Sequence, residues 1–143
     1  MTLARHLALS VLFFSLAANA QDRGEETIKD PKPNTAEGTI AAALEAGLAG
    51  DFDAYLETIH PEHKATTEQR SQRQKYEWAR FEKQAAWYVV SQKPMTFVIA
   101  RRQPDGDNYL KVFLKDQKNK ERMPVPVQLK KDGAGWKIVT SSL

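Results

Sequence analysis

The sequence predicts an α+β domain in which N-terminal helices pack on a curled antiparallel β-sheet. Two periodicities support this fold class. Between residues 36 and 88 the apolar side chains recur every three or four positions, as on one face of a helix, and after Pro94 they alternate, as in half-buried strands. Short clusters of Pro, Asp, Asn and Gly separate the alternating segments, which is typical of strands joined by tight turns.

The first two helices are predicted by their ends as well as by their apolar faces. Thr35 is a suitable N-cap and Gly50 a suitable C-cap for the first helix, and Asp51 can cap the second. The second helix should end at His60, because a residue before proline avoids the helical conformation. The apolar residues that share a face are Ile40, Leu44 and Leu48 in the first helix, and Phe52, Tyr55, Leu56 and Ile59 in the second.

A third, longer helix is predicted over residues 67–87. Its buried stripe comprises Trp78, Phe81, Ala85 and Tyr88. Arg73 and Glu77 lie four residues apart, and we expect them to form a modestly stabilising pair on the exposed side of this helix.

Four strands are predicted after Pro94, over residues 95–100, 109–115, 123–130 and 136–139. The turns between them are expected at 103–108, 118–121 and 132–135. Pro124 and Pro126 lie two residues apart, so their backbone groups point to the same edge of the strand. Because neither has an N–H, that edge should be poorly paired over the first half of the strand.

The N-terminus predicts export. Arg5 and His6 precede a short apolar run over residues 7–16, and 18–20 read Ala-Asn-Ala, a typical signal-peptidase site. We expect a signal peptide over 1–20, a flexible tether over 21–35 and a single domain over 36–143. Cleavage would follow Ala20, leave no membrane span, and place the protein in a periplasm or outside the cell.

Charge and cysteine content exclude some classes of function. The chain of 143 residues has no cysteine, so core packing must hold the domain without disulfides. Residues 21–143 contain 20 basic and 18 acidic residues, a balance too even to indicate nucleic-acid binding. The sheet region nevertheless carries many basic residues: Arg101, Arg102, Lys111, Lys115, Lys118, Lys120, Arg122, Lys130, Lys131 and Lys137. They either bind an anionic polymer or an acidic partner, or form a face that is exposed to solvent.

Two segments resemble parts of a known superfamily. Residues 46–53 (AGLAGDFD) resemble the link between the first two helices of the nuclear transport factor two-like, or SnoaL-like, cone fold, and residues 127–138 (VQLKKDGAGWKI) resemble its closing hairpin. The resemblance covers roughly residues 36–143, and it is closest to uncharacterised bacterial envelope members. It implies a cone whose sheet curls around the helices and leaves a cavity. Members of the superfamily use this cavity as an active site or as a small-molecule site, or fill it with side chains.

If the cone is open, large apolar side chains of the helices and first strand would line its cavity. The candidate ligand-binding residues are Tyr55, Ile59, Trp78, Phe81, Tyr88 and Phe97. The alternative for these side chains is core packing.

No residue pattern predicts catalysis, a metal site or a cofactor. His60 and His63 stand near Glu57 and Glu62, but Pro61 interrupts the helix between the histidines, so a polar turn is favoured over a metal site. The acidic residues near the helix starts, Asp51, Asp53 and Glu57, form no evident acid–base pair. The sequence therefore favours a non-catalytic exported module that binds a small apolar ligand or an envelope protein. The alternatives are a SnoaL-like lyase or isomerase acting on a small apolar molecule, and a homodimer formed through the sheet.

Overall fold

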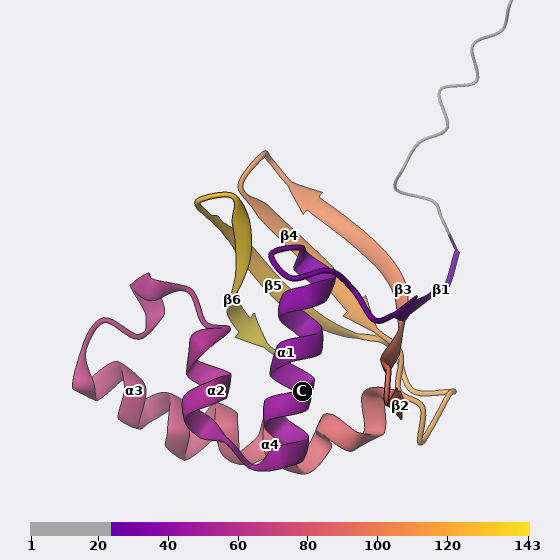
Figure 1. Cartoon of the computed structure of the whole chain (residues 1–143), viewed down its shortest axis with the longest axis horizontal. Coiled ribbons are helices and arrows are strands. Elements are labelled where there is room, and N and C mark those ends of the chain that lie inside the picture. Colours follow the sequence, from indigo (N-terminus) through magenta and orange to yellow (C-terminus); the bar gives the residue numbers. More distant parts are fainter. Residues whose placement is uncertain (1–23) are drawn as a thin grey trace, which may run out of the picture.

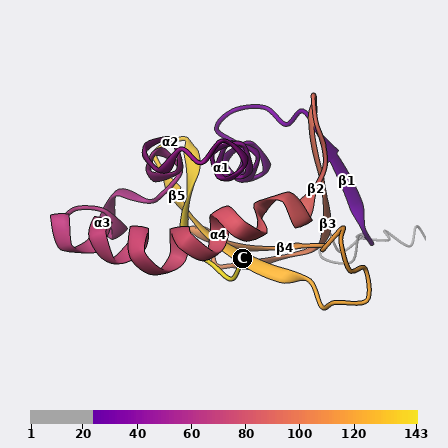
Figure 2. The same ribbon diagram turned by 90° about the horizontal axis from the view of Figure 1, so that it is seen from below.

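The computed structural model describes residues 24–143 and confirms the α+β class. Helices cover one face of a six-stranded antiparallel sheet that does not close into a barrel (Figure 1). Seen from below, the sheet curls, so that α1 and α4 lie on its concave side (Figure 2). The expected signal peptide, its cleavage site and residues 21–23 lie outside the described residues.

The helical elements follow one another before the main sheet. They are α1 (Ala36–Ala49), α2 (Phe52–Glu57), the 3-10 turn η1 (Pro61–His63), α3 (Thr67–Arg73), the π-helical turn η2 (Gln74–Trp78), α4 (Ala79–Gln84) and the 3-10 turn η3 (Ala85–Tyr88). The last four are contiguous in sequence, so the long helix predicted over 67–87 is confirmed, with a π turn at its centre that the sequence did not predict.

The predicted helix caps are confirmed. Thr35 accepts a hydrogen bond from Gly38 N at 2.9 Å, and Asp51 accepts one from Ala54 N at 3.0 Å. Gly50 ends α1 in the left-handed conformation, with φ of 67°. These side-chain and backbone contacts satisfy helix-end groups that otherwise have no intrahelical partner.

Helix α1 packs closely on the end of the long helix through a small residue. A Cβ atom added at Gly47 would lie 2.7 Å from Ala85 Cβ and 2.9 Å from Phe81 Cε1. Only a residue without a side chain fits at this distance. The alanine-rich face of α1 therefore brings the two helices together and fills the core between them.

The strands are β1 (Glu26–Lys29), β2 (Val89–Gln92), β3 (Met95–Asp105), β4 (Tyr109–Leu114), β5 (Val125–Asp132) and β6 (Gly135–Ser141). Their order across the sheet is β1-β3-β4-β5-β6, and β2 also pairs with β3. Strand β3 holds β1 along its first half and is long enough to pair with both β2 and β4.

Two short strands depart from the sequence prediction. Residues 26–29, part of the expected tether, form β1, in which Ile28 is buried and pairs with Phe97. Strand β2 was not predicted at all. Each has only four residues and is held by pairing with β3, a long-range contact that local sequence does not reveal. Strand β3 also continues to Asp105, through the first residues of the turn predicted at 103–108.

The prediction for the proline-containing strand is confirmed. Its ladder with β6 begins at Val127, which pairs with Ser141, and before that residue a single backbone hydrogen bond is formed, from Ser142 N to the Pro126 carbonyl at 3.1 Å. Pro126 still lies opposite Phe113 of β4 on the other side. The strand starts at Val125, two residues later than predicted, and Met123 is left exposed.

Candidate functional site

The six residues predicted to line an apolar pocket lie together in the hydrophobic core. Each of Tyr55, Ile59, Trp78, Phe81, Tyr88 and Phe97 is at most 6 % exposed. The Tyr55 ring packs against Trp78 and Phe81, with ring centroids 5.0 and 4.8 Å apart. The larger surface hollows of the described chain are lined by other residues.

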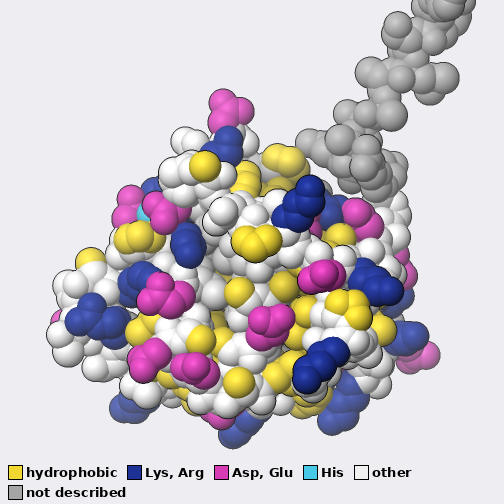
Figure 3. Space-filling model, in the orientation of Figure 1, with side chains coloured by type: hydrophobic (Ala, Val, Ile, Leu, Met, Phe, Trp, Pro, Cys, Tyr) yellow, Lys and Arg dark blue, Asp and Glu magenta, His cyan; other side chains and the backbone are white. Residues whose placement is uncertain are grey.

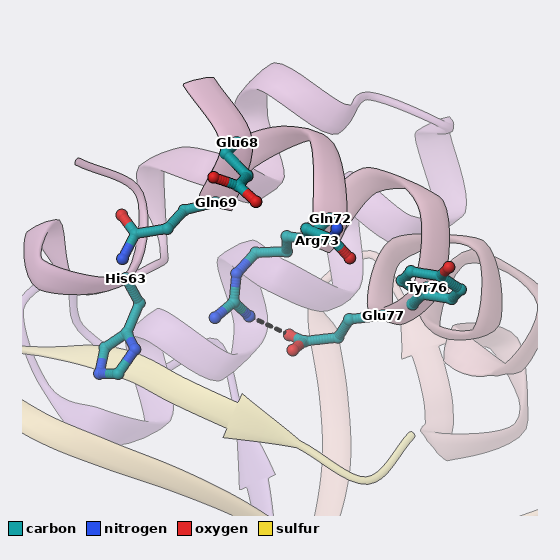
Figure 4. A pocket seen from close by; sticks show the side chains of 7 residues that line it. All are labelled: His63, Glu68, Gln69, Gln72, Arg73, Tyr76 and Glu77. Carbon is teal, nitrogen blue, oxygen red and sulfur yellow. Dashed lines mark hydrogen bonds and ion pairs between the residues drawn. The ribbon is translucent and has the colours of Figure 1, made fainter. Parts of the chain in front are cut away.

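A polar hollow of about 470 Å³ opens beside the long helix, and we call it the Arg73 hollow (Figure 4). Its lining residues are His63, Glu68, Gln69, Gln72, Arg73, Tyr76 and Glu77. Six of them come from α3 and η2. The seventh, His63, comes from η1 and lies on the other side of the hollow.

The start of α3 is fixed by a reciprocal cap that also positions one lining side chain. Thr66 Oγ1 accepts a hydrogen bond from Gln69 N, and Gln69 Oε1 accepts one from Thr66 N, both at 3.1 Å. Gln69 Nε2 donates to the carbonyl of Glu62 at 3.2 Å. The cap thus ties α3 to the turn that carries His63.

Arg73, Glu77 and Tyr55 form a connected network at the inner wall of this hollow. Arg73 Nη1 and the Tyr55 hydroxyl both donate to Glu77 Oε1. Arg73 Nη2 donates to the carbonyl of Val139 in β6 at 3.1 Å. The side chains of Arg73 and Glu77 are only 10 % and 17 % exposed, so the prediction that this pair lies on the exposed side of the helix is wrong. The reason is that the helix rests against Tyr55 and β6.

The network keeps the Tyr55 hydroxyl protonated. Burial raises the pKa of Tyr55 well above its usual value, and the negative charge of Glu77 raises it further. Arg73 opposes this shift with a smaller effect. Tyr55 is therefore a hydrogen-bond donor that orients Glu77 rather than an acid that titrates near neutral pH.

The hollow offers both donors and acceptors. Within the described residues, Arg73 Nε donates to no protein group, whereas both Nη atoms are engaged. A guanidinium held from one side presents its remaining N–H groups in a fixed direction. Such N–H groups suit a ligand that carries acceptor oxygens.

The histidines of the predicted polar turn have different roles. His60 is buried, accepts a hydrogen bond from Glu62 N at its Nδ1, and directs its Nε2 at the carbonyl of Lys131, each at 3.3 Å. These contacts fix a structural role for His60 and leave only His63 at the hollow. Over residues 24–143, no group of three or more His, Asp or Glu side chains is placed to hold a metal ion.

Several basic residues of the predicted strip are occupied by ion pairs. Arg102 binds Glu26 at 2.6 Å and Glu37 at 2.8 Å, which ties β1 and α1 to β3. Lys130 pairs with Glu62 at 2.8 Å, and Lys115 pairs with Glu25. On the helical face of the molecule, acidic and basic side chains are interspersed (Figure 3). None of the helices described is long and apolar enough to cross a membrane.

In comparisons with known proteins, no family model, no curated protein and no solved structure matched this chain.

Sequence reasoning named His63, Arg73 and Glu77 but did not predict that they line a common hollow. The spacing of Gln69, Arg73 and Glu77 places them one turn apart on a single helix face, and this signal was visible. What was not visible is that this face turns toward Tyr55 and β6.

Proposed function

We propose that this chain is an exported, non-catalytic binding module that holds one small polar ligand in the Arg73 hollow. In this proposal it is a member of the nuclear transport factor two-like cone superfamily, and its ligand site lies at the side of the cone. The proposed ligand is polar, in place of the small apolar molecule expected from the sequence, because the lining side chains are polar and the apolar candidates are in the core.

The observation that carries this proposal is the prearranged Arg73 side chain. Its Nη atoms are held by Glu77 and by the Val139 carbonyl, its Nε donates to no group of the described residues, and the side chain forms part of the lining. A ligand then binds without first ordering this long side chain, which lowers the entropic cost of binding. Its carboxylate, carbonyl or hydroxyl oxygen would accept from Arg73, and the amides of Gln69 and Gln72 lie along the same wall.

The same network favours binding over proton transfer. Glu77 is the least exposed of the carboxylates that line the hollow, and its Oε1 already accepts from a phenol and from a guanidinium. Using this oxygen as a base would require one of those bonds to break. A general base should instead be free to reach the proton it removes.

Native mass spectrometry tests the proposal. The full chain is expressed in a bacterial host, purified from the periplasm and analysed by electrospray mass spectrometry under non-denaturing conditions. We expect a mass that starts at Gln21 and carries one small molecule per chain. Gln72→Trp, which fills the hollow, should lose the molecule. Lys75→Trp, a matched exposed position that does not line the hollow, should retain it.

A bare wild-type mass, or equal loss in both tryptophan variants, would argue against a ligand in this hollow. The same spectrum gives the oligomeric state. A bare dimer would favour the homodimer through the sheet, and an attached protein would favour an envelope partner.

A second candidate function is a SnoaL-like lyase or isomerase. The observation that favours it is the contact between a buried tyrosine and a carboxylate at an open hollow, the Tyr55–Glu77 pair. Such an enzyme would remove a proton from carbon. The co-purified molecule, eluted and returned to the protein in D₂O, would then gain mass with wild type and not with Glu77→Gln. An unchanged mass with both proteins is the result expected of a binding module.

A further inference from the structure

A second hollow lies at the opposite end of the long helix, and we call it the Trp87 hollow. It has a volume of about 330 Å³ and is lined by Trp87, Asp116, Lys118, Asn119 and Arg122. Trp87 belongs to η3, and the other four residues come from the connection between β4 and β5. The backbone N–H of Gln117 donates to the Trp87 carbonyl at 2.6 Å, which anchors this connection against η3.

The single acidic group of this lining is already occupied. Asp116 is 1 % exposed, and its Oδ1 accepts from the backbone N–H groups of Lys118 and Asn119 at 2.8 and 2.9 Å. Its Oδ2 lies 3.5 Å from Arg122 Nη1. The carboxylate therefore shapes the loop around itself and leaves little acceptor capacity for a ligand.

Two basic side chains of the lining, Lys118 and Arg122, lie beside the face of the Trp87 ring. Lys118 Nζ lies 4.7 Å and Arg122 Cζ 5.5 Å from the centroid of the Trp87 ring. Among the described residues, Lys118 pairs with no carboxylate, and the carboxylate contact of Arg122 is the 3.5 Å one with Asp116. With Asp116 counted, the lining keeps an excess of one positive charge.

A buried hydroxyl behind this hollow is also without a partner. Within residues 24–143, Tyr88 Oη is buried and has no hydrogen-bond partner. Burial raises the pKa of Tyr88, the charge of Asp116 raises it further, and the Arg122 side chain opposes the shift. A ligand in the hollow would not reach this hydroxyl, because Tyr88 is not one of the lining residues and its Oη is enclosed by protein atoms.

We propose that the Trp87 hollow binds a small molecule through an anionic oxygen group, a phosphate or a carboxylate. Lys118 and Arg122 would supply the positive charge, and the Trp87 face would support the body of the molecule. This site is separate from the Arg73 hollow and does not depend on the function proposed for it.

Nuclear magnetic resonance of the tryptophan indole N–H groups tests this proposal. The ¹⁵N-labelled protein has three tryptophans, and Trp87→Phe assigns the signal of interest by its disappearance. Sodium phosphate and sodium acetate are titrated separately, with sodium chloride holding the ionic strength constant. We expect a saturable shift of the Trp87 signal, and the anion that binds more tightly identifies the phosphate or the carboxylate as the preferred group.

Variants that remove one charge show which residues bind the anion. Lys118→Gln and Arg122→Gln should each weaken binding about tenfold, the loss of one charged hydrogen bond. Lys120→Gln removes the same charge from the same loop but not from the lining, and should leave the affinity unchanged.

The proposal is overturned if the Trp87 signal responds to neither phosphate nor acetate beyond the sodium chloride control. Equal weakening by Lys120→Gln and by the two lining variants would also overturn it, since that result means general charge screening only.

Discussion

The phenol of Tyr55, in the core, donates its hydrogen bond to the carboxylate of Glu77, on the wall of the Arg73 hollow. This contact connects the packed aromatic core to the polar surface site. Because Glu77 also accepts from Arg73, the position of the guanidinium depends on a residue that no ligand in the hollow can reach. Stability and ligand binding should therefore respond together to changes in this network.

Alkaline pH should destabilise the protein partly through Tyr55. Its folded-state pKa lies above the unfolded value of 10.0, so the stability it contributes is present below pH 10 and is lost as the pH rises beyond it. Between pH 10 and 11 wild type should lose about 1 kcal/mol more than Tyr55→Phe. Urea unfolding at both pH values measures this difference, and parallel losses in the two proteins would show that Tyr55 does not cause it.

Glu77→Gln should destabilise the protein by about 2 kcal/mol, because it leaves the Arg73 guanidinium largely buried without its counter-charge. Glu68→Gln is the matched control, since Glu68 also lines the hollow but is exposed and should change stability by less than about 0.5 kcal/mol. Denaturant unfolding at pH 7 measures both. Similar values for the two variants would mean that the ion pair contributes nothing specific.

Gly47→Ala should destabilise the protein by about 1–3 kcal/mol, because the new methyl group would overlap Ala85 and the Phe81 ring. Gly24→Ala serves as control, since a Cβ at that position has no heavy atom within 4 Å. Thermal unfolding compares the two variants. A wild-type melting temperature for Gly47→Ala would show that α1 can move away from the long helix at little cost.

Tyr88→Phe should leave the ligand-free protein as stable as wild type or more stable by about 1 kcal/mol, because it removes a buried hydroxyl that has no partner. Chemical unfolding in a buffer without phosphate or carboxylate measures this change. A loss above about 1 kcal/mol would indicate that the hydroxyl is hydrogen-bonded in the free protein.

Much of the fold could be predicted from local sequence. The caps at Thr35 and Asp51 marked the starts of the first two helices, Gly50 marked the end of the first, and alternation after Pro94 defined the larger strands. Helix α2 ends at Glu57, before the predicted end at His60. Strands β1 and β2 could not be predicted in this way, because each is four residues long and depends on β3 for its hydrogen bonds. The π turn at 74–78 likewise has no local sequence signal.

The candidate site was harder to predict than the fold. Tyr55 was predicted to line an apolar pocket or to pack in the core; its ring lies in the core, and its hydroxyl donates to Glu77, a contact that the sequence did not predict. Arg73 was recognised as one half of a helical pair and placed on the wrong side. The periodicity of a helix gives the relative directions of its side chains, whereas the partner of each face is set by tertiary packing, here by β6 and its Val139 carbonyl.

The most direct test of a ligand in the Arg73 hollow follows the Arg73 side chain itself. The Nε–H signal of Arg73 is compared between protein as purified from the periplasm and the same protein after unfolding and refolding in ligand-free buffer. If the hollow holds a polar ligand, the Arg73 signal should differ between the two samples, while that of Arg101, which lies over the Phe113 ring, should stay unchanged. Superimposable Arg73 signals would contradict the account.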